Sequence, residues 1–566
     1  MKNNKYIKKC LLVCCLVMLT ALLGCGGQDT GQSGNDNTEE MQKEEAFDAV
    51  DDEPGETVGD IEGDAAGNQE DEEEITKAGT LEILIQSKSH IDYSNDDRYN
   101  TIYSGVYDLV HLSDDAKALY PELSKALEKY NENKETAFMA TYEQYKEEAL
   151  GWYEDMGEDD YFNGYSDEDR VSIGRADDQF LSIISYLSSY TGGAHGFYGC
   201  SGYNYDVKTG QELKLKDVIS DIDSLQVIVK EKLSEEYEGA PFLESIDESV
   251  PEYLTGEEDQ ACSWFMTPQG VDIYFGIYML GSYAEGAQTI HILYSEHPEL
   301  FFEGFHVQEG NYIESFGPYV NFYTDVDNDG VTESLCVDPE YDEYGSMTDM
   351  MISVNDKQTK VEGYGFDVSP SIVHIDGKSF LYIDVTTDND YRTTYAVSLS
   401  GDGAKLIEQY NGYITGKVPD ADYEAEWASY WSVAYTSPDN LYFGDRMQLL
   451  STYGGIAKAS IDASGKLNVD DYYYANIYGD YGKLTVKETV TGCSKVDPDT
   501  MEQTAKDVAI PVGTVLKIYG TNGKDFVDLT DESGTFYRIN VDYSDWPQRV
   551  NGKDIEEVFD GTMFAG

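Results

Sequence analysis

The N-terminus carries a short apolar stretch, and this feature decides in which compartment the rest of the chain folds. Lys2, Lys5, Lys8 and Lys9 precede an apolar run from Cys10 to Leu23. A membrane-spanning helix needs about 20 apolar residues, so this run is too short to span a bilayer comfortably. A positively charged start followed by a short apolar core is typical of a secretory signal peptide. The sequence therefore predicts that the chain is exported.

The apolar run ends in Leu22-Leu23-Gly24-Cys25, which resembles the lipobox of bacterial lipoproteins. The resemblance implies that residues 1–24 are a signal peptide, and that Cys25 carries a lipid and becomes the first residue of the mature chain. The alternative is an ordinary secretory signal with a chance cysteine. We expect a lipid-anchored monomer on the extracytoplasmic face of the cell membrane, as on a Gram-positive cell surface.

Residues 25–78 are predicted to form an acidic, disordered tether. Positions 26–78 contain 19 acidic residues and two lysines among many Gly, Gln, Asn and Thr residues. Such a segment has too little apolar surface to bury a core, and its like charges extend the chain. We expect the tether to hold the folded part away from the membrane.

The chain is strongly acidic, with a formal net charge of −71. Removing the four lysines of the signal peptide makes the mature charge −75. Such a surface repels nucleic acid and anionic lipid headgroups, and it favours cations, basic proteins and neutral glycans. A simpler interpretation is that the acidity keeps a surface protein soluble.

Four cysteines follow Cys25, namely Cys200, Cys262, Cys336 and Cys493. Four cysteines in so long a chain do not form a disulfide framework. A bridge between Cys200 and Cys262 remains open in an oxidising compartment. There is no CxxC pair, so a thiolate zinc site is not expected.

Residues 79–210 combine strand and helix patterns. Ser113 offers an N-cap, and Pro121 suits the first position of a helix. The predicted elements are, in order, strands at Leu81–Ile85 and Ile102–Leu112, helices at Pro121–Asn133 and Ala137–Tyr153, a loop at Glu154–Asp169, and strands at Val171–Ile173 and Phe180–Tyr190. The pattern predicts an α+β unit.

Several short motifs follow in a characteristic order. They are Gly192-Gly193-Ala194-His195-Gly196, the run Tyr-Asp-x-Lys-Thr-Gly-x-x-Leu from Tyr205, Phe265-x-Thr267-Pro268-x-Gly270-Val271-x-Ile273-Tyr274-Phe275, and Tyr283-Ala284-x-Gly286. This order resembles the extracellular domain pair of the RsiV and PdaC type, found in lysozyme-sensing anti-sigma factors and beside the catalytic module of peptidoglycan deacetylases. The resemblance covers about residues 80–305.

The resemblance implies an antiparallel sheet with helices on one side, with its first half at residues 79–210 and its second half at 211–305. It implies binding at the cell envelope rather than catalysis, because in the deacetylases the catalytic domain is a separate module that follows the pair. No such module is evident in the sequence. Gly192, Gly193, His195 and Gly196 are the candidate loop or interface residues.

Residues 306–481 are expected to be β-rich and to contain a calcium-type loop. Asp325, Asp327 and Asp329 alternate at positions 1, 3 and 5, Val331 offers its carbonyl at position 7, and Glu333 closes the shell. Oxygen ligands at this spacing suit Ca²⁺. The loop is similar to the calcium hairpins of integrin-type propellers and is not an EF-hand, because position 12 is a cysteine. An acidic β-turn with solvated carboxylates is the alternative.

The C-terminal part has two further features. Trp427 and Trp431 share a face if Tyr423–Tyr435 is helical, as their four-residue spacing predicts. Residues 482–566 contain short strands joined by Asn-Gly and Ser-Gly turns, in an order that resembles a small SH3-like β-barrel. The final residues are expected to pack back on this unit through Phe559 and Phe564.

No catalytic motif is evident. The sequence has no GxSxG, HExxH or phosphate-binding loop. His195 is more plausible as a residue that orders its loop than as a base or ligand, because no partner nucleophile accompanies it. His291, His297 and His306 leave a zinc site open without favouring it.

The leading hypothesis is a non-enzymatic surface lipoprotein that binds an envelope-related or host protein, such as lysozyme, whose basic surface would complement the acidic chain. One alternative is a wall protein that binds peptidoglycan or another glycan through its aromatic residues, of which 47 are tyrosines. A second alternative is an undetected cell-wall hydrolase or deacetylase.

Overall fold

The computed structural model describes residues 81–95, 100–157, 162–256, 261–422, 427–477, 482–497 and 500–565. The predicted signal peptide, Cys25 and the tether lie outside these residues. Within the described ranges, none of the helices combines the length and the apolar character that crossing a bilayer requires.

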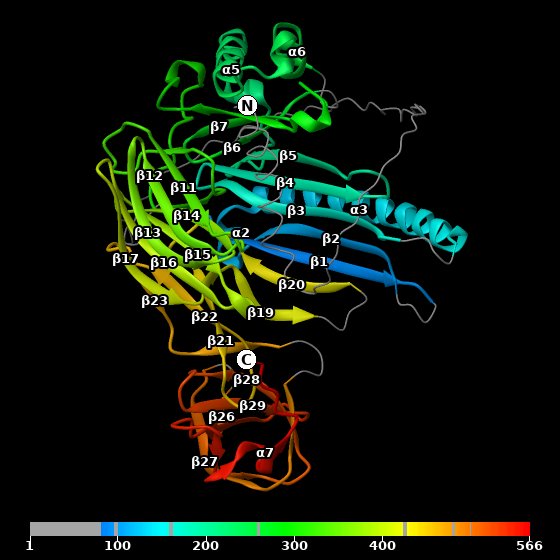
Figure 1. Cartoon of the computed structure of the whole chain (residues 1–566), viewed down its shortest axis with the longest axis vertical. Helices are drawn as coiled ribbons and strands as arrows, with labels where there is room; N and C mark the ends of the chain where they lie inside the picture. The colour runs from blue at the N-terminus through cyan, green and yellow to red at the C-terminus, as the bar shows by residue number, and fades with distance from the viewer. Residues whose placement is uncertain are drawn as a thin grey trace, which may run out of the picture.

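A seven-stranded sheet forms the N-terminal part, in the order β19-β20-β1-β2-β3-β4-β5. Its strands are β1 (Ile83–Tyr93), β2 (Thr101–Leu112), β3 (Tyr165–Ala176), β4 (Phe180–Tyr190), β5 (Phe197–Asp206), β19 (Lys417–Asp422) and β20 (Ala428–Val433). Neighbouring strands are antiparallel except β2 and β3, which are parallel. A parallel pair needs a long crossover, and here the crossover contains a helix that packs on the sheet (Figure 1).

That crossover helix is α3 (Pro121–Asp155), preceded by the short helix α2 (Asp114–Leu119). The predicted N-terminal signals are confirmed: the Ser113 hydroxyl accepts a hydrogen bond from the backbone N–H of Ala116, and Pro121 begins α3. The prediction of two helices with a break after Asn133 is wrong, because α3 is continuous over 35 residues.

Two polar residues of α3 near the expected break face the sheet. The Asn131 side chain donates to the carbonyl of Val110 and accepts from its N–H, at 2.8 and 2.9 Å. The buried ammonium of Lys134 lies 2.6 Å from the carboxylate of Asp169. Asp169 belongs to β3, so the predicted loop Glu154–Asp169 is also wrong at its C-terminal end. Satisfied polar groups of this kind fix the position of a helix on a sheet.

Strand β20 corrects another prediction. Residues Tyr423–Tyr435 were expected to be helical, but β20 pairs with β1, with Trp431 opposite Gln86. Figure 1 shows β20 and β19 beside β1, although they are far apart in the sequence. The β1–β20 pairing joins a strand from residues 79–210 to a strand from residues 306–481, so the sheet extends across the domain boundary expected at residue 306. Trp431 therefore lies within a strand and Trp427 immediately before it, so their four-residue spacing does not mark a helical face.

A second layer covers the edge of the sheet at β4 and β5 (Figure 1). Its elements are α4 (Leu215–Val218), α5 (Ile222–Glu236), α6 (Ile246–Thr255), β6 (Ser263–Met266), β7 (Gly270–Phe275) and β8 (Gln288–Leu293). A Cβ on Gly202 of β5 would lie 1.9 Å from the carbonyl oxygen of Trp264, so only glycine permits this close approach. The buried thiol of Cys262 is free, so no bridge to Cys200 is formed.

The next region is a sandwich of two sheets that share a core of Val, Ile, Leu and Met side chains. One sheet contains β10 (Phe322–Thr324), β11 (Glu333–Tyr341), β12 (Met347–Val354) and β13 (Lys357–Gly365). The other contains β17 (Gly403–Asn411), β16 (Arg392–Ser400), β15 (Lys378–Thr386), β14 (Asp367–Ile375) and β9 (Tyr312–Ser315). The predicted β-rich character of this region is confirmed.

A twelve-stranded sheet completes the chain. Its strands are β18 (Tyr413–Thr415), β21 (Leu441–Met447), β22 (Tyr453–Ile461), β23 (Leu467–Val469), β24 (Tyr473–Asn476), β25 (Lys483–Val486), β26 (Val490–Val496), β27 (Gln503–Ile510), β28 (Val515–Thr521), β29 (Phe526–Asp531), β30 (Phe536–Asn540) and β33 (Phe559–Asp560). Beside it lie β31 (Arg549–Val550), β32 (Lys553–Asp554) and α7 (Ile555–Val558). Phe559 is buried and Phe564 packs against the same core, as predicted for the tail. The SH3-like character of residues 482–566 stays a prediction.

Candidate functional site

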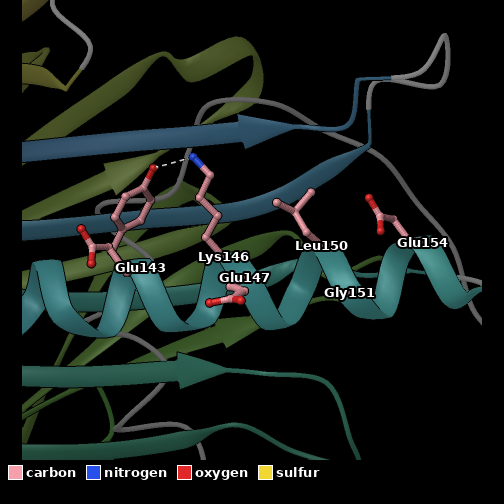
Figure 2. A pocket seen from close by; sticks show the side chains of 7 residues that line it. Glu143, Lys146, Glu147, Leu150, Gly151 and Glu154 are labelled. Atoms are coloured by element: carbon pink, nitrogen blue, oxygen red, sulfur yellow. Dashed lines mark hydrogen bonds between the residues drawn. The ribbon is translucent and has the colours of Figure 1, made fainter.

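A groove runs along the C-terminal half of α3 (Figure 2). It has a volume of about 550 Å³. Its lining consists of Tyr142, Glu143, Lys146, Glu147, Leu150, Gly151 and Glu154, which come from successive turns of the one helix. Three of these seven residues are acidic and one is basic.

The basic residue of this groove is committed to an internal network. The Lys146 ammonium lies 2.6 Å from the Asp92 carboxylate of β1 and 2.9 Å from the Tyr142 hydroxyl, which also donates to Asp92. Burial opposes ionisation of Asp92, but the hydrogen bonds from Lys146 and Tyr142 outweigh it, so the pKa of Asp92 is lowered. Figure 2 shows Lys146 reaching away from the helix to this bond with the tyrosine. The groove therefore presents a net negative charge, carried by the exposed residues Glu143, Glu147 and Glu154.

The loop from Gly192 to Gly196 joins β4 to β5 and touches the end of α3. Gly192 and Gly193 have φ of +81° and +109°, a region that glycine adopts at low cost. A Cβ on Gly192 would lie 2.1 Å from Cζ3 of Trp152. Trp152 of α3 therefore packs on the loop backbone while 45% of its surface stays exposed.

His195 lies at the exposed tip of this loop. Its ring stacks on Tyr283, with centroids 3.9 Å apart and planes at 20°. The Nδ1 atom lies 3.1 Å from the carbonyl oxygen of Gly196. Tyr283 begins the 3₁₀ helix η2 (Tyr283–Glu285), so two of the motifs behind the predicted resemblance touch each other. This geometry suits a residue that orders its loop.

Two further aromatic side chains lie beside Tyr283 of the His195 stack. Tyr198 and Tyr278 each have their ring centroid 5.9 Å from that of Tyr283. Tyr278 and Phe197 are 58% and 54% exposed. Sequence reasoning missed Trp152 and Tyr278 as surface residues of this region, because their exposure depends on contacts between distant segments.

The predicted calcium loop lies between β10 and β11. Carboxylate oxygens of Asp325, Asp327 and Glu333 come within 4.8 Å of one another. Asp329 lies outside this group, and its carboxylate accepts the backbone N–H of Val331 at 2.8 Å. The structure thus brings together three of the four predicted acidic ligands, and the Val331 side chain points to solvent.

Backbone N–H groups orient the three carboxylates. The N–H groups of Val326, Gly330 and Gly401 donate at 3.0, 2.8 and 3.0 Å, respectively, to carboxylates of the group. Gly330 has φ of +87°, which allows the sharp turn. Burial raises the pKa of Glu333, and the neighbouring aspartates raise it further. A cation placed among these oxygens would relieve this repulsion.

Two further histidines of the sequence analysis, His291 and His306, take structural partners. His291 lies 2.7 Å from Asp272 on the neighbouring strand, which it faces across the β7–β8 pair. His306 contacts the carbonyl oxygen of Val307 at 2.8 Å. In the part of the chain that the structure describes, the Asp325 group is the one cluster of three candidate metal ligands.

Comparison with known proteins gives one family match and two solved structures. The family model described as Deacetylase PdaC matches residues 115–198. A DUF3298 family member from Bacteroides fragilis has 19% identity and a TM-score of 0.31, covering 40% of this chain and 96% of its own. A DUF3298 family protein from Pseudomonas aeruginosa has 16% identity and a TM-score of 0.28, covering 41% of this chain and 99% of its own. No curated protein matches the chain. The matched segment contains α3, β3, β4 and the Gly192–Gly196 loop, so the chain contains a PdaC-type domain.

Proposed function

We propose that this protein is a non-enzymatic cell-surface lipoprotein that binds a basic protein of the lysozyme type at the α3 groove. A PdaC-type domain points to a role at the cell surface or envelope. The observation that carries the proposal further is the charge of the groove. Glu143, Glu147 and Glu154 face solvent, while the charge of Lys146 is neutralised by Asp92.

Electrostatic complementarity supports this choice of partner. A negative surface steers a positively charged protein toward it and speeds association, most strongly at low salt. Leu150 lies among the acidic side chains of the groove and offers an apolar contact. The groove would therefore provide long-range attraction together with this contact.

The test is the binding of the whole chain to immobilised lysozyme. The triple variant Glu143→Gln, Glu147→Gln, Glu154→Gln should slow association at least several-fold at low salt and weaken its salt dependence. A matched control removes the same charge elsewhere, with Glu502→Gln, Asp507→Asn and Glu532→Gln on the C-terminal sheet, where all three residues are exposed. Equal effects of the two triple variants on association would mean that binding depends only on total charge, and would contradict binding at the groove.

The lack of enzymatic activity is part of this proposal. Purified cell-wall fragments incubated with the protein, with and without divalent metal, should stay unchanged in size and acetylation. Any released sugar, peptide or acetate that depends on the protein would overturn the non-enzymatic part and favour a hydrolase or deacetylase.

The anchor is proposed on the sequence motif that ends at Cys25. The variant Cys25→Ala should appear in the culture medium rather than the membrane fraction, because one or two acyl chains supply the membrane affinity. Retention of the variant in the membrane fraction would contradict lipid anchoring at this residue.

We also propose that the group of Asp325, Asp327 and Glu333 binds Ca²⁺. Three carboxylates held close together by backbone N–H groups match the oxygen ligands that this ion prefers. Val331 would add its carbonyl. The ion would fix the β10–β11 turn, and its role is structural.

Two further structural resemblances are also proposed. One is the likeness of residues 80–305 to the RsiV-type domain pair, supported by the contact between His195 and Tyr283 from two of its motifs. The other is SH3-like character at residues 482–566, supported by the consecutive antiparallel pairs β28–β29 and β29–β30.

A further inference from the structure

A second cleft lies where the twelve-stranded sheet passes from β24 to the C-terminal strands. It has a volume of about 650 Å³. Its lining consists of Lys458, Asp470, Asp471, Tyr472, Tyr474, Met501, Asn522, Lys524, Phe526 and Arg538. We infer that this cleft binds a neutral oligosaccharide. The inference does not depend on the lysozyme proposal, because the two sites share no residue.

The floor of this cleft is a fixed network around one buried carboxylate. Asp528 is fully buried. It accepts hydrogen bonds from Arg538 Nε at 2.8 Å and Nη2 at 2.7 Å, and from the Tyr472 hydroxyl at 3.0 Å. Burial and the adjacent carboxylate raise the pKa of Tyr472, so the phenol stays protonated and keeps donating. Bidentate arginine pairs fix both partners geometrically.

The network holds aromatic faces in place. The Arg538 guanidinium lies 3.8 Å from the centroid of the Phe526 ring. The rings of Tyr472 and Phe526 are 6.4 Å apart and 29° from parallel, and Tyr474 meets Tyr472 edge-on at 5.0 Å. A Cβ on Gly520 would lie 2.3 Å from the Tyr472 hydroxyl oxygen, so glycine is what lets this ring reach Asp528. The aromatic surface is therefore preorganised.

The charges of the cleft balance. Arg538 is paired with Asp528, and the Lys524 ammonium lies 3.2 Å from Asp471. Lys458 and Asp470 are exposed at the rim and have opposite charges. In a chain with a net charge of −71, this local neutrality disfavours both polyanions and polycations.

Rigid aromatic faces with a polar, neutral rim fit the chemistry of a sugar ring. The C–H face of a pyranose packs on an aromatic ring, and its hydroxyl or acetamido groups accept and donate hydrogen bonds at the edge. Sites of this kind combine apolar walls with a few placed polar groups. The side-chain amide oxygen Oδ1 of Asn522 accepts hydrogen bonds from the backbone N–H groups of Lys524 and Asp525, which fixes the hairpin that carries Phe526.

Calorimetry with the whole chain tests the inference, using chitotetraose and cellotetraose as separate probes. We expect at least one of them to bind, with little change between low and high salt. Phe526→Ala and Tyr472→Ala should weaken binding roughly tenfold or more, as for aromatic anchors elsewhere. Tyr364→Ala, at an exposed tyrosine of the sandwich, is the control and should have no effect.

Because Tyr472 and Phe526 also support the fold, the rim variants Lys458→Ala and Asp470→Ala are measured as well. Both positions are exposed, so these variants should keep the melting temperature while weakening binding several-fold. Failure of both tetrasaccharides to bind, or binding that none of the four variants weakens, would overturn the inference. Lysozyme binding should be the same in all four variants, which separates the two proposals.

Discussion

The imidazole ring of His195 lies flat against the phenol ring of Tyr283, with centroids 3.9 Å apart. The stack joins the β4–β5 loop to the β7–β8 connection, and thus the first sheet to the layer that covers its edge. A contact between two such segments should appear as an energetic coupling between the two side chains.

A double-mutant cycle measures that coupling. His195→Ala and Tyr283→Ala should each destabilise the domain, and their combination should cost less than the sum, by about 0.5–1.5 kcal/mol. Hydrogen exchange of the β5 amides reports the local stability. The pair His195→Ala and Tyr344→Ala, at an exposed tyrosine of the sandwich, should be additive. Additivity of the first pair would mean that the stack does not hold the loop.

Gly192 should tolerate no side chain. Gly192→Ala adds a methyl group against Trp152 and strains a positive φ, so we expect a loss of roughly 2–4 kcal/mol from overpacking and strain. Gly193→Ala also strains a positive φ, but nothing lies within 4 Å of the added Cβ. This variant should therefore lose less stability than Gly192→Ala. Thermal melting compares the variants. Adding Trp152→Ala should recover part of the loss for Gly192→Ala and none for Gly193→Ala.

The calcium proposal predicts a stability difference that depends on the ion. Asp327→Ala should lower the melting temperature in calcium and have little effect in chelator, because a ligand stabilises only the state that binds it. Asp329→Ala should keep most of the calcium response, since Asp329 lies outside the carboxylate group. Equal effects of Asp327→Ala with and without calcium would count against a bound ion.

Glu314 should make stability depend on pH. Burial, with a smaller contribution from nearby Asp272, raises its pKa to about 8 from an ordinary value of 4.5. The folded state then holds a proton that the unfolded state releases, so this contribution is complete below pH about 4.5 and is lost as pH rises through about 8.

Glu314→Gln replaces the protonated carboxyl with a neutral group of similar shape. The melting temperatures of the wild type and this variant should be close at pH 5, and the variant should gain relative to the wild type as the pH approaches 8. Melting curves at several pH values provide the measurement, with Glu340→Gln at an exposed strand position as the control. A constant difference across this range would show that Glu314 does not titrate in it.

Local sequence signals predicted much of the N-terminal fold. The N-cap at Ser113, the start of α3 at Pro121 and the strand Phe180–Tyr190 were all predicted and are confirmed. Each depends on residues that are close in the chain, such as a hydroxyl three positions before the N–H that it caps.

The wrong predictions involve long-range partners. A helix was expected to end near Asn133, but α3 continues, and the polar Asn131 and Lys134 are satisfied by Val110 and Asp169 in the folded chain. The segment around Trp431 looks helical by spacing, but it forms a strand because β1, more than 300 positions earlier, offers a free edge. Periodicity carries no information about either partner.

The candidate sites show the same contrast between local sequence signals and long-range contacts. Asp325, Asp327 and Glu333 were found from spacing, because a tight hairpin keeps close in space what is close in sequence. The α3 groove was not predicted, because its charge depends on Asp92 of β1 neutralising Lys146.

Hydrogen exchange of the whole chain, with and without lysozyme, tests the central claim most directly. Binding at the groove should protect amides of residues 143–154. The sandwich and the C-terminal sheet should exchange at unchanged rates. Protection confined to other segments, or no change anywhere at saturating lysozyme, would contradict the claim that α3 carries the binding surface.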